Sequence, residues 1–275
     1  MPQPYLVHTS SHPVRVPHST WIQWYTEEHI RDMVYTNAVK TACFYRATSH
    51  VVRTPIIPED DNEVLALARI PSATPPDGND FKQFLALYQT DKKDFLDHAE
   101  YRDRVRLTTS LWGRTSSCHD VGSFTSSDLE LMDAIHDEHM DKDEPATHII
   151  HCKITGNYVP RSLLQDLTSS AEKIQGYRRT LLYQPLATHV TPGDVNGNGV
   201  VNGVTTDATA PENTGPFTIM IHEYSSAVDV QGLATLSGIL EGSNDGISIA
   251  IRPFELLESE GYSGKVRKPE RLPAN

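Results

Sequence analysis

The residues at 20–35, TWIQWYTEEHIRDMVY, combine aromatic, acidic and imidazole side chains at the spacing of a helix. At about 100° per residue, one broad face carries the large apolar side chains, namely Trp21, Ile22, Trp24, Tyr25, Met33 and Tyr35. Glu28 and Asp32 fall in the middle of that face, and His29 lies near its edge. Carboxylates among aromatic rings cost free energy unless they are paired or solvated, so the pattern predicts a functional site. The alternative is that these acids mark the edge of a buried stripe or cap a neighbouring element.

The elements that must position this helix occur in the same order in both halves of the chain. In the first half we expect strands at 5–9, 40–46, 84–90 and 128–135, and helices at 20–35 and 93–108. In the second half we expect strands at 147–154, 179–184, 217–224 and 247–254, and helices at 160–174 and 228–240. Each half therefore has the predicted element order β-α-β-β-α-β, which is that of a ferredoxin-like unit.

A single ferredoxin-like unit covers one face of its sheet with helices and leaves the other face bare. Two units can cover each other by packing sheet to sheet, and they can then enclose a cavity. We therefore predict an α+β fold in which two tandem units form an intrachain dimeric α+β barrel. The expected boundaries are a first unit at 1–136, a charged linker at 137–146, a second unit at 147–262 and a tail at 263–275. A Gly/Asn/Thr/Pro-rich stretch at 191–216 is expected to be a flexible insertion in the second unit.

The composition excludes several classes of protein. The 275 residues carry a net charge of −12, which disfavours binding to a nucleic-acid backbone. We find no apolar run of about 20 residues and no signal-peptide pattern at the start, so we expect a cytoplasmic protein without a membrane partner. The three Cys have no metal-type spacing. A calcium-like loop at 194–205 and an H-x-x-H pair at His136 and His139 are better explained as a linker and solvated histidines. We predict no metal site.

Three short motifs in the first half resemble the EthD-type dimeric α+β-barrel family, including its fungal secondary-metabolism members. They are Trp-Tyr-x-Glu-Glu-His-Ile at 24–30, Phe-Tyr-Arg at 44–46 and Leu-Ala-Leu-Tyr at 85–88. The resemblance implies a cofactor-free enzyme of polyketide-type specialised metabolism with a largely apolar, aromatic substrate. It also implies that His29 is the helix histidine at the cavity mouth and that Tyr88 is the aromatic residue on the strand. The second half lacks the helix motif, so we expect two unequal cavities, of which one is active.

The hypothesis of a cofactor-free enzyme assigns a role to each candidate residue. His29 would be the general acid and base, since the ordinary pKa of histidine lies near neutrality. Glu28 or Asp32 would orient His29 or balance its charge, and Tyr88 and Tyr45 would donate hydrogen bonds to a developing enolate oxygen. The walls of the pocket are assigned to Trp21, Trp24 and Tyr25. The predicted reaction is proton transfer followed by cyclisation, isomerisation or decarboxylation.

Polar residues on strands of the second half suggest a weaker site. His222 and Tyr224 share one face of their strand, and with His151 and Arg252 they could line a second, substrate-binding cavity. Histidines in strands are more often structural, and that alternative is the stronger one here. A haem enzyme of the chlorite-dismutase type, with His222 or His151 as axial ligand, is an alternative function. A non-catalytic binding barrel is another, and self-association into a homo-oligomer stays open.

Overall fold

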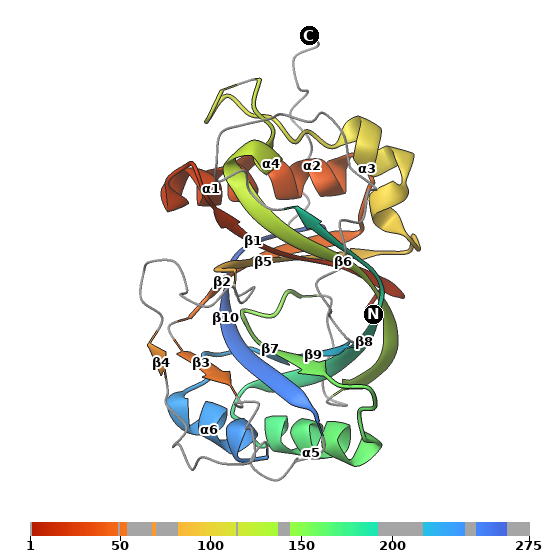
Figure 1. The fold of residues 1–275 in the computed structure, drawn as a ribbon, viewed down its shortest axis with the longest axis vertical. Helices are drawn as coiled ribbons and strands as arrows, with labels where there is room; N and C mark the ends of the chain where they lie inside the picture. The colour runs from red at the N-terminus through yellow and green to blue at the C-terminus, as the bar shows by residue number, and fades with distance from the viewer. Residues whose placement is uncertain are drawn as a thin grey trace.

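The computed structural model describes residues 2–48, 50–53, 68–69, 82–113, 115–136, 144–191, 217–239 and 246–262. The calcium-like loop, His139, most of the insertion at 191–216, most of the charged linker and the tail at 263–275 lie outside these residues. Two layers of helices enclose a ring of strands, with one helical layer at each end of the long axis (Figure 1).

The first half supplies four strands of the ring, β1 (Tyr5–Pro13), β2 (Thr41–Ala47), β5 (Phe84–Thr90) and β6 (Gly122–His136). One continuous helical segment follows β1 and comprises α1 (His18–Trp24), the π-helical turn η1 (Tyr25–His29) and α2 (Ile30–Tyr35). Between β5 and β6 lie the 3₁₀ turn η2 (Phe95–Asp97), α3 (Ala99–Arg104) and α4 (Cys118–Val121). Two short strands, β3 (His50–Arg53) and β4 (Ala68–Arg69), were not predicted.

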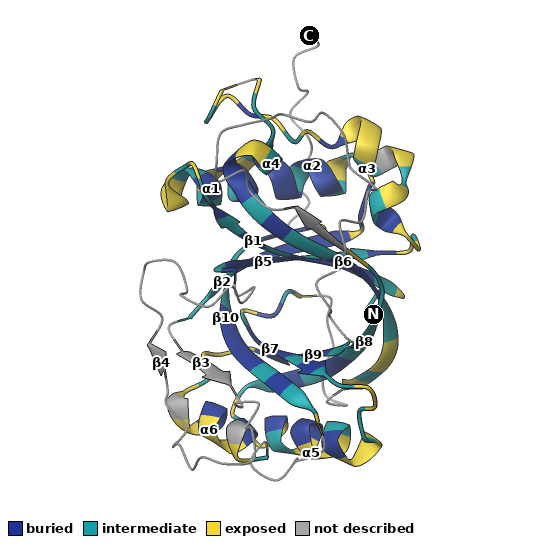
Figure 2. Cartoon of the chain, viewed as in Figure 1, coloured by how far each residue is buried: buried dark blue, intermediate teal, exposed yellow. Residues whose placement is uncertain are grey.

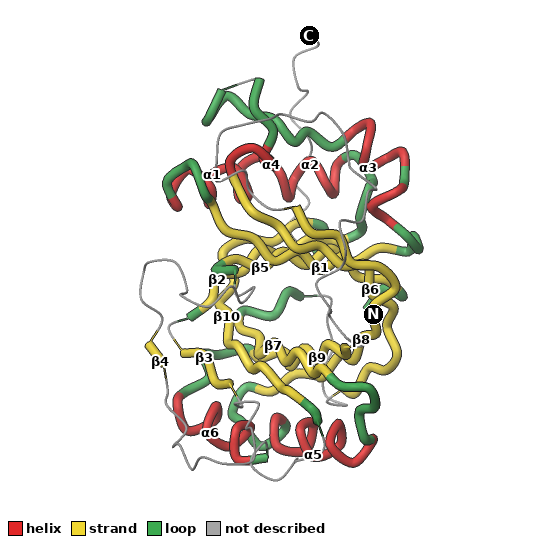
Figure 3. Tube along the Cα trace, viewed as in Figure 1, coloured by secondary structure: helices red, strands yellow, loops and turns green. Residues whose placement is uncertain are grey.

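The second half supplies the other four strands, β7 (His148–Thr155), β8 (Tyr177–Thr191), β9 (Phe217–Tyr224) and β10 (Ser248–Glu260). Its helices are α5 (Arg161–Ala171) and α6 (Val230–Gly238), and both lie on the side of the ring opposite α1–α4 (Figure 3). Both halves thus contain the predicted β-α-β-β-α-β order. Strands β6, β8 and β10 extend well beyond their predicted limits.

The eight strands close into an antiparallel barrel. Their order is β2-β5-β1-β6-β8-β9-β7-β10, and a pairing of β10 with β2 completes the ring. The fourth strand of each unit pairs with the second strand of the other, through β6 with β8 and through β10 with β2. The predicted α+β barrel of two units is therefore confirmed, and the units are related by an approximate two-fold axis.

Side chains fill most of the barrel interior, where we expected a cavity, and leave only a small space of about 10 Å³ beside Cys43, Glu223 and Tyr262. The lumen holds a buried cluster of Leu6, Cys43, Tyr45, Leu85, Leu129, Ala146, Ile149, Leu181, Tyr183, Ile219, Ile221, Phe254 and Tyr262. Eight strands enclose a space just wide enough for their own side chains, which explains the filling. Much of the length of the barrel strands is coloured as buried (Figure 2).

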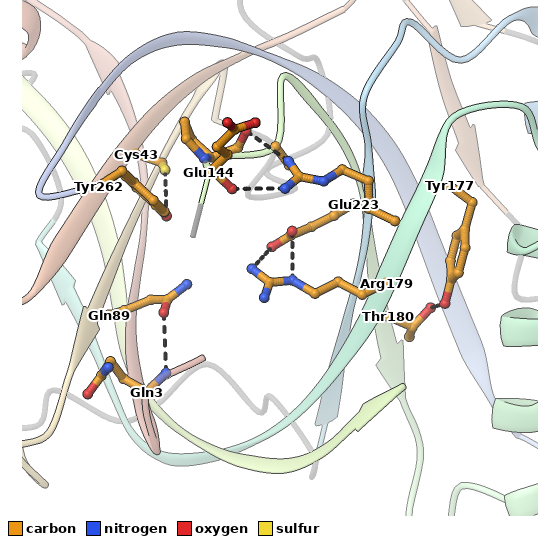
Figure 4. Close-up of polar contacts among 12 residues, drawn as sticks. Gln3, Cys43, Gln89, Glu144, Tyr177, Arg179, Thr180, Glu223 and Tyr262 are labelled. Carbon is orange, nitrogen blue, oxygen red and sulfur yellow. Dashed lines mark hydrogen bonds and ion pairs between the residues drawn. The ribbon is translucent and has the colours of Figure 1, made fainter. Parts of the chain in front are cut away.

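Polar groups in the lumen are paired with one another. Arg179 donates to both carboxylate oxygens of Glu223, at 2.7 and 2.9 Å (Figure 4). The Cys43 thiol lies 3.2 Å from the Tyr262 hydroxyl. Ala146, at the end of the predicted linker, is buried in this lumen and accepts a hydrogen bond from Tyr45, although the linker was expected to bury almost nothing.

The helix predicted at 20–35 departs from uniform spacing in its middle. Ile30 N–H donates to Tyr25 C=O, a bond that spans five residues and widens the turn. The wide turn keeps His29 on the buried face beneath Tyr25, with 6% exposure, whereas uniform spacing placed it at the edge. Tyr35 was predicted on the buried face and is 44% exposed. The prediction of one helix at 93–108 is also wrong, because the segment forms only the short η2 and α3 there.

Two histidines meet inside the barrel at equivalent positions of the two units. His8 is the fourth residue of β1 and His151 the fourth residue of β7, and their Nε2 atoms are 2.9 Å apart. Burial, together with the charge of Lys153, lowers the pKa of His8 to about 4. Burial also lowers the pKa of His151, as do the neighbouring His8, Lys153 and Arg252. Both rings are therefore neutral in the folded protein at neutral pH.

The neutral pair makes the folded state sensitive to acid. Unfolded histidines bind protons below about pH 6.5, whereas these two stay neutral in the folded state. The free energy of unfolding therefore falls as the pH drops from 6.5 towards 4, by about 2 kcal/mol at pH 5 for His8 alone. Urea unfolding of a His8→Phe/His151→Phe variant should show a weaker loss between pH 7.5 and 5. The exposed His18→Gln variant is the control, and equal losses in all three proteins would contradict the prediction.

Candidate functional site

His29 lies in an aromatic cluster between the helices and the outer face of the first sheet. Its ring stacks on Trp24 with centroids 4.4 Å apart, and Tyr25 and Tyr88 meet it edge-on at 5.3 and 6.0 Å. Trp24 and Tyr25 come from the turn before His29, and Tyr88 comes from β5. The structure thus brings four of the predicted site residues together.

These residues enclose a small cavity of about 30 Å³. The cavity is lined by Val7, Thr9, Trp24, Tyr25, His29, Met33, Tyr88, Phe95, Leu96, Tyr101, Leu107, Cys118, His119, Phe124 and Ser126. A space of this size holds about two water molecules and is far smaller than a typical ligand pocket. None of these lining residues is Lys, Arg, Asp or Glu, so the cavity walls carry no formal charge at neutral pH.

Three buried polar atoms on the lining residues have no hydrogen-bond partner in the described parts of the chain. They are Nδ1 of His29, Nδ1 of His119 and the hydroxyl oxygen of Tyr88, whose contact with the Tyr25 hydroxyl falls outside ordinary hydrogen-bond geometry. An unsatisfied buried polar group costs about 1–3 kcal/mol, and proteins normally avoid it. Three such atoms around one cavity indicate a site that is built to make hydrogen bonds with a molecule inside it.

The tautomer of His29 follows from its contacts. Its ring donates a hydrogen bond to the backbone of Arg106, and since Nδ1 has no partner among the described residues, the donor is Nε2. Nδ1 therefore carries a bare lone pair. Burial, with a smaller contribution from the nearby His119, lowers the pKa of His29 to about 3, although the hydrogen bond to the Arg106 backbone opposes the shift. The imidazole is neutral at physiological pH and can accept a proton only at Nδ1.

The other titratable groups of the cavity are also held neutral. Burial raises the pKa of Tyr88 well above its ordinary value, and the Tyr25 and Tyr101 hydroxyls add to the shift. Burial raises the pKa of Cys118 to about 12, so this side chain is a thiol and not a reactive thiolate. Tyr88 can therefore donate a proton in a hydrogen bond, and Cys118 is not a nucleophile here.

The two predicted acids contact the segment that closes the cavity. Asp32 accepts two hydrogen bonds from Arg106, at 2.8 and 3.1 Å, and Glu28 accepts one from the Thr109 hydroxyl at 2.8 Å. Their hydrogen bonds within the described chain thus go to residues 106–109 instead of to His29. The acids were alternatively expected to mark the edge of a buried stripe or to cap a neighbouring element, whereas these contacts go to the side chains of Arg106 and Thr109.

Trp21 supports the cavity from behind. It lies fully buried against Trp24, Trp112 and Phe124, with ring centroids 5.4, 6.0 and 5.4 Å away. Gly122 at the start of β6 makes this packing feasible, because a Cβ atom there would overlap the indole ring. Trp21 is therefore not a wall residue, contrary to the prediction.

Tyr45 does not belong with Tyr88. Successive residues of a strand face opposite sides of the sheet, and β2 points Phe44 towards the helices and Tyr45 into the barrel lumen. There Tyr45 donates to the Ala146 carbonyl at 3.2 Å. Its predicted role beside Tyr88 is wrong, because the sheet separates the two hydroxyls.

The predicted second cavity is divided by the sheet in the same way. His222 and Tyr224 of β9 face the helices α5 and α6, whereas His151 and Arg252 face the lumen. Arg252 donates to the Lys82 carbonyl at 2.6 Å, and His151 bonds to His8. These residues cannot line one site.

His222 is held in a filled core. Its Nδ1 bonds to the Thr180 hydroxyl at 2.8 Å, and burial lowers its pKa to about 3. The space between its sheet and the helices is filled by Ile150, Cys152, Ile154, Leu163, Leu167, Met220, Leu233, Leu236, Ile249 and Ile251. A haem there would have to displace this cluster, so the packing does not fit the haem alternative.

A comparison of the two units explains why the cavity lies in the first. Val7 pairs with Tyr88, and at the equivalent place Ile150 pairs with His222. Extending this register along the strands gives three matched pairs, Val7 and Ile150, Thr9 and Cys152, and Ser126 and Ile251. The side chains of the second unit are larger or less polar, and they fill the volume that stays open in the first.

His119 was not predicted. It lies in α4, which begins with a capping box in which Ser117 N–H donates to Asp120 at 2.6 Å and His119 N–H donates to the Ser117 hydroxyl at 3.4 Å. The S-x-x-D spacing of this box was readable in the sequence and marks a helix start. The spacing does not reveal that the helix delivers His119 to the cavity.

Among the described residues, no group of three or more His, Cys, Asp or Glu side chains could hold a metal ion. None of their helices combines the length and apolar character that crossing a membrane requires.

Comparison with known proteins finds similarity in structure alone. The sequence matches no protein-family model, and no curated protein matches it. An anthrone oxidase-like protein is similar at 10% identity, over 96% of this chain and 95% of the other, with a TM-score of 0.42. A candidate monooxygenase from Lactobacillus acidophilus NCFM is 8% identical over 94% and 98%, with a TM-score of 0.44. Another, from Fusobacterium nucleatum subsp. nucleatum, is 7% identical over 94% and 95%, also at 0.44.

A stability measurement can test whether the Tyr88 hydroxyl makes a hydrogen bond in the folded protein. Tyr88→Phe removes a buried group that has no hydrogen bond, so the empty protein should keep its free energy of unfolding or gain up to about 1 kcal/mol. Tyr45→Phe is the matched control, since it leaves the Ala146 carbonyl unpaired and should cost about 1 kcal/mol. Urea unfolding of both variants at pH 7.5 measures the difference. An equal loss in both would mean that the Tyr88 hydroxyl has a partner.

Proposed function

We propose that the cavity of the first unit is the active site of an enzyme that moves a proton on an uncharged, largely apolar aromatic substrate without a cofactor. The observation that carries this proposal is the set of three buried polar atoms, each without a partner among the described residues, around one small, mostly apolar cavity. A binding site uses such atoms to orient a ligand, and a catalytic site uses them to exchange protons with it.

His29 would act as the base. Its Nε2–H is engaged by the Arg106 backbone, so the Nδ1 lone pair would take a proton from an acidic C–H of the substrate. The Tyr88 hydroxyl would donate a hydrogen bond to the oxygen on which negative charge develops. The imidazolium and the enolate would then form an ion pair inside a dry site, which offsets the low basicity that burial gives to the empty site.

Return of the proton to a different carbon would complete an isomerisation, and attack of the same enolate carbon on a carbonyl of the substrate would close a ring. Decarboxylation, the third predicted reaction, needs a substrate carboxylate, which these uncharged walls disfavour. His119, with its own unpartnered Nδ1, would accept a hydrogen bond from a second polar group of the substrate. The resemblance of residues 24–30 to EthD-type proteins supports a polyketide-derived aromatic compound as the substrate.

The charge of the substrate follows from the cavity walls. A carboxylate or phosphate would enter a space whose lining residues offer no cation, and burying an unpaired ion costs several kcal/mol. The rings of Trp24, Tyr25 and Phe124 suit the face of an uncharged aromatic molecule.

The cavity must enlarge to admit such a molecule. Its outer wall is formed by residues between Phe95 and His119, where Leu96, Leu107 and Trp112 are only partly buried. The opposite wall belongs to the barrel, where Val7, Tyr88 and Phe124 are buried. Opening would therefore involve movement of the outer wall.

Exchange of a C–H proton with solvent tests the proposal directly. The test compound is 2-tetralone, an uncharged aromatic ketone with acidic C–H bonds, and deuterium uptake in D₂O is followed by NMR. The wild-type protein should accelerate uptake, and His29→Gln should lose at least about 100-fold of that acceleration. His18→Gln, which changes an exposed histidine, should retain it. Binding of 2-tetralone without accelerated uptake would indicate a non-catalytic binding protein.

The pH dependence of the exchange provides a separate test. The active form of His29 is the neutral one, and its lowered pKa of about 3 keeps it neutral throughout the usable range. The rate constant per unit of free enzyme should therefore be flat between pH 5 and 8 after subtraction of the hydroxide-catalysed background. A decline centred near pH 6.5 would show an exposed imidazole and would contradict the buried base.

A further inference from the structure

The contact between Asp32 and Arg106 lies directly beside the proposed base. We propose that Asp32 and Arg106 form a positioning pair, which holds the Arg106 carbonyl at the Nε2–H of His29 and keeps the bare Nδ1 of His29 facing the cavity. The importance of this pair for catalysis rests on the proposed function, whereas its effect on the His29 tautomer does not.

The ion pair between Arg106 and Asp32 is bidentate. Arg106 Nε and one terminal nitrogen each donate to a different oxygen of Asp32, at 2.8 and 3.1 Å. Such two-point contacts fix the direction of the guanidinium as well as its distance. The hydrogen bond to Asp32 is also the main cause that raises the pKa of Arg106.

Arg106 is tied to the helical segment at both its ends. Its side chain binds Asp32 in α2, and its backbone accepts a hydrogen bond from His29, three residues earlier in the same segment. Movement of the side chain away from Asp32 would therefore release the carbonyl that selects the His29 tautomer. Without that acceptor, His29 would be free to carry its proton on Nδ1, where it could no longer act as a base.

A second contact docks the same stretch. Thr109 donates to Glu28 at 2.8 Å, and the Thr109 hydroxyl accepts a bond from Leu111 N–H at 3.2 Å. Residues 106–109 are thus held at two points one helical turn apart. Glu28 and Asp32 were expected to act on His29 directly, and these contacts give them an indirect route through the cavity wall.

The pair is suited to positioning more than to stabilising the fold. Asp32 is 8% exposed, but the Arg106 side chain is 54% exposed, and ion pairs with one partner in solvent contribute little to stability. The structure around the pair is held by the aromatic cluster instead. Variants that break the pair should therefore fold.

The test reads the tautomer of His29 by ¹⁵N NMR of the imidazole nitrogens in the full chain, without any substrate. In the wild-type protein, His29 should show the Nε2–H form alone. Asp32→Asn and Arg106→Gln should each raise the Nδ1–H form to a measurable fraction, and Asp32→Glu should restore the wild-type spectrum. Glu27→Gln is the control, since it removes one charge from an exposed site on the same helical segment.

The outcomes separate this inference from the proposed function. A wild-type tautomer in both Asp32→Asn and Arg106→Gln would overturn the positioning role, whatever the exchange assay shows. A shifted tautomer would support it even if 2-tetralone is not a substrate. If the protein does exchange 2-tetralone, the two variants should slow exchange at least about tenfold, with an unchanged half-saturating concentration. If Asp32→Asn does not fold, Arg106→Gln still breaks the ion pair, and because the Arg106 side chain is exposed, that substitution should leave the fold intact.

Discussion

Closure of the barrel is the constraint on which the rest of the structure depends. Two seams join the units, β6 with β8 and β10 with β2, and together they remove every free edge from the eight main strands. Closure also gives each strand one face in the lumen and one face under helices. Since eight strands enclose a lumen that their own side chains nearly fill, space for a ligand arises more readily between a sheet and its helices. The cavity beside His29 lies there.

The cost of the site is visible in its unsatisfied polar atoms. His29, Tyr88 and His119 each keep a buried atom without a partner among the described residues, in a protein whose other buried polar groups are mostly paired. In the second unit the equivalent volume is filled by aliphatic side chains, which is the arrangement that maximises stability. The difference between the units indicates that the first one gives up stability for a site, a trade-off that is common in enzymes.

The duplication has different consequences inside and outside the barrel. In the lumen the two units meet as near equals, and His8 and His151 form a hydrogen bond across the approximate two-fold axis. On the outer faces they have diverged, with Tyr88 in one unit and His222 at the matching place in the other. His222 keeps a hydrogen bond from one ring nitrogen to Thr180, and its Nε2 has no partner among the described residues, but the aliphatic side chains packed around it leave no room for a ligand.

The sequence by itself determined the order of elements, because strand and helix periodicities are local properties of the chain. That order, together with the bare sheet face of each unit, was sufficient to predict the α+β barrel. The sequence also singled out His29, Trp24 and Tyr25, since an aromatic helical face interrupted by polar groups is a local signal, whereas Tyr88 was proposed from the family resemblance. Only the tertiary structure decided which strand face met the helices, and a difference of one residue moved Tyr45 to the wrong side of the sheet.

Tertiary contacts also decided the roles of the polar residues around His29. The π turn at Tyr25–His29 shifted the helical phase and buried the imidazole, which uniform spacing could not anticipate. Arg106 and His119 come from sequence positions some 80 to 90 residues away from His29, and no local pattern links them to it. Hydrogen bonds over such separations depend on how the chain closes in space, and for that reason the tautomer and the pKa of His29 could not be read from the sequence.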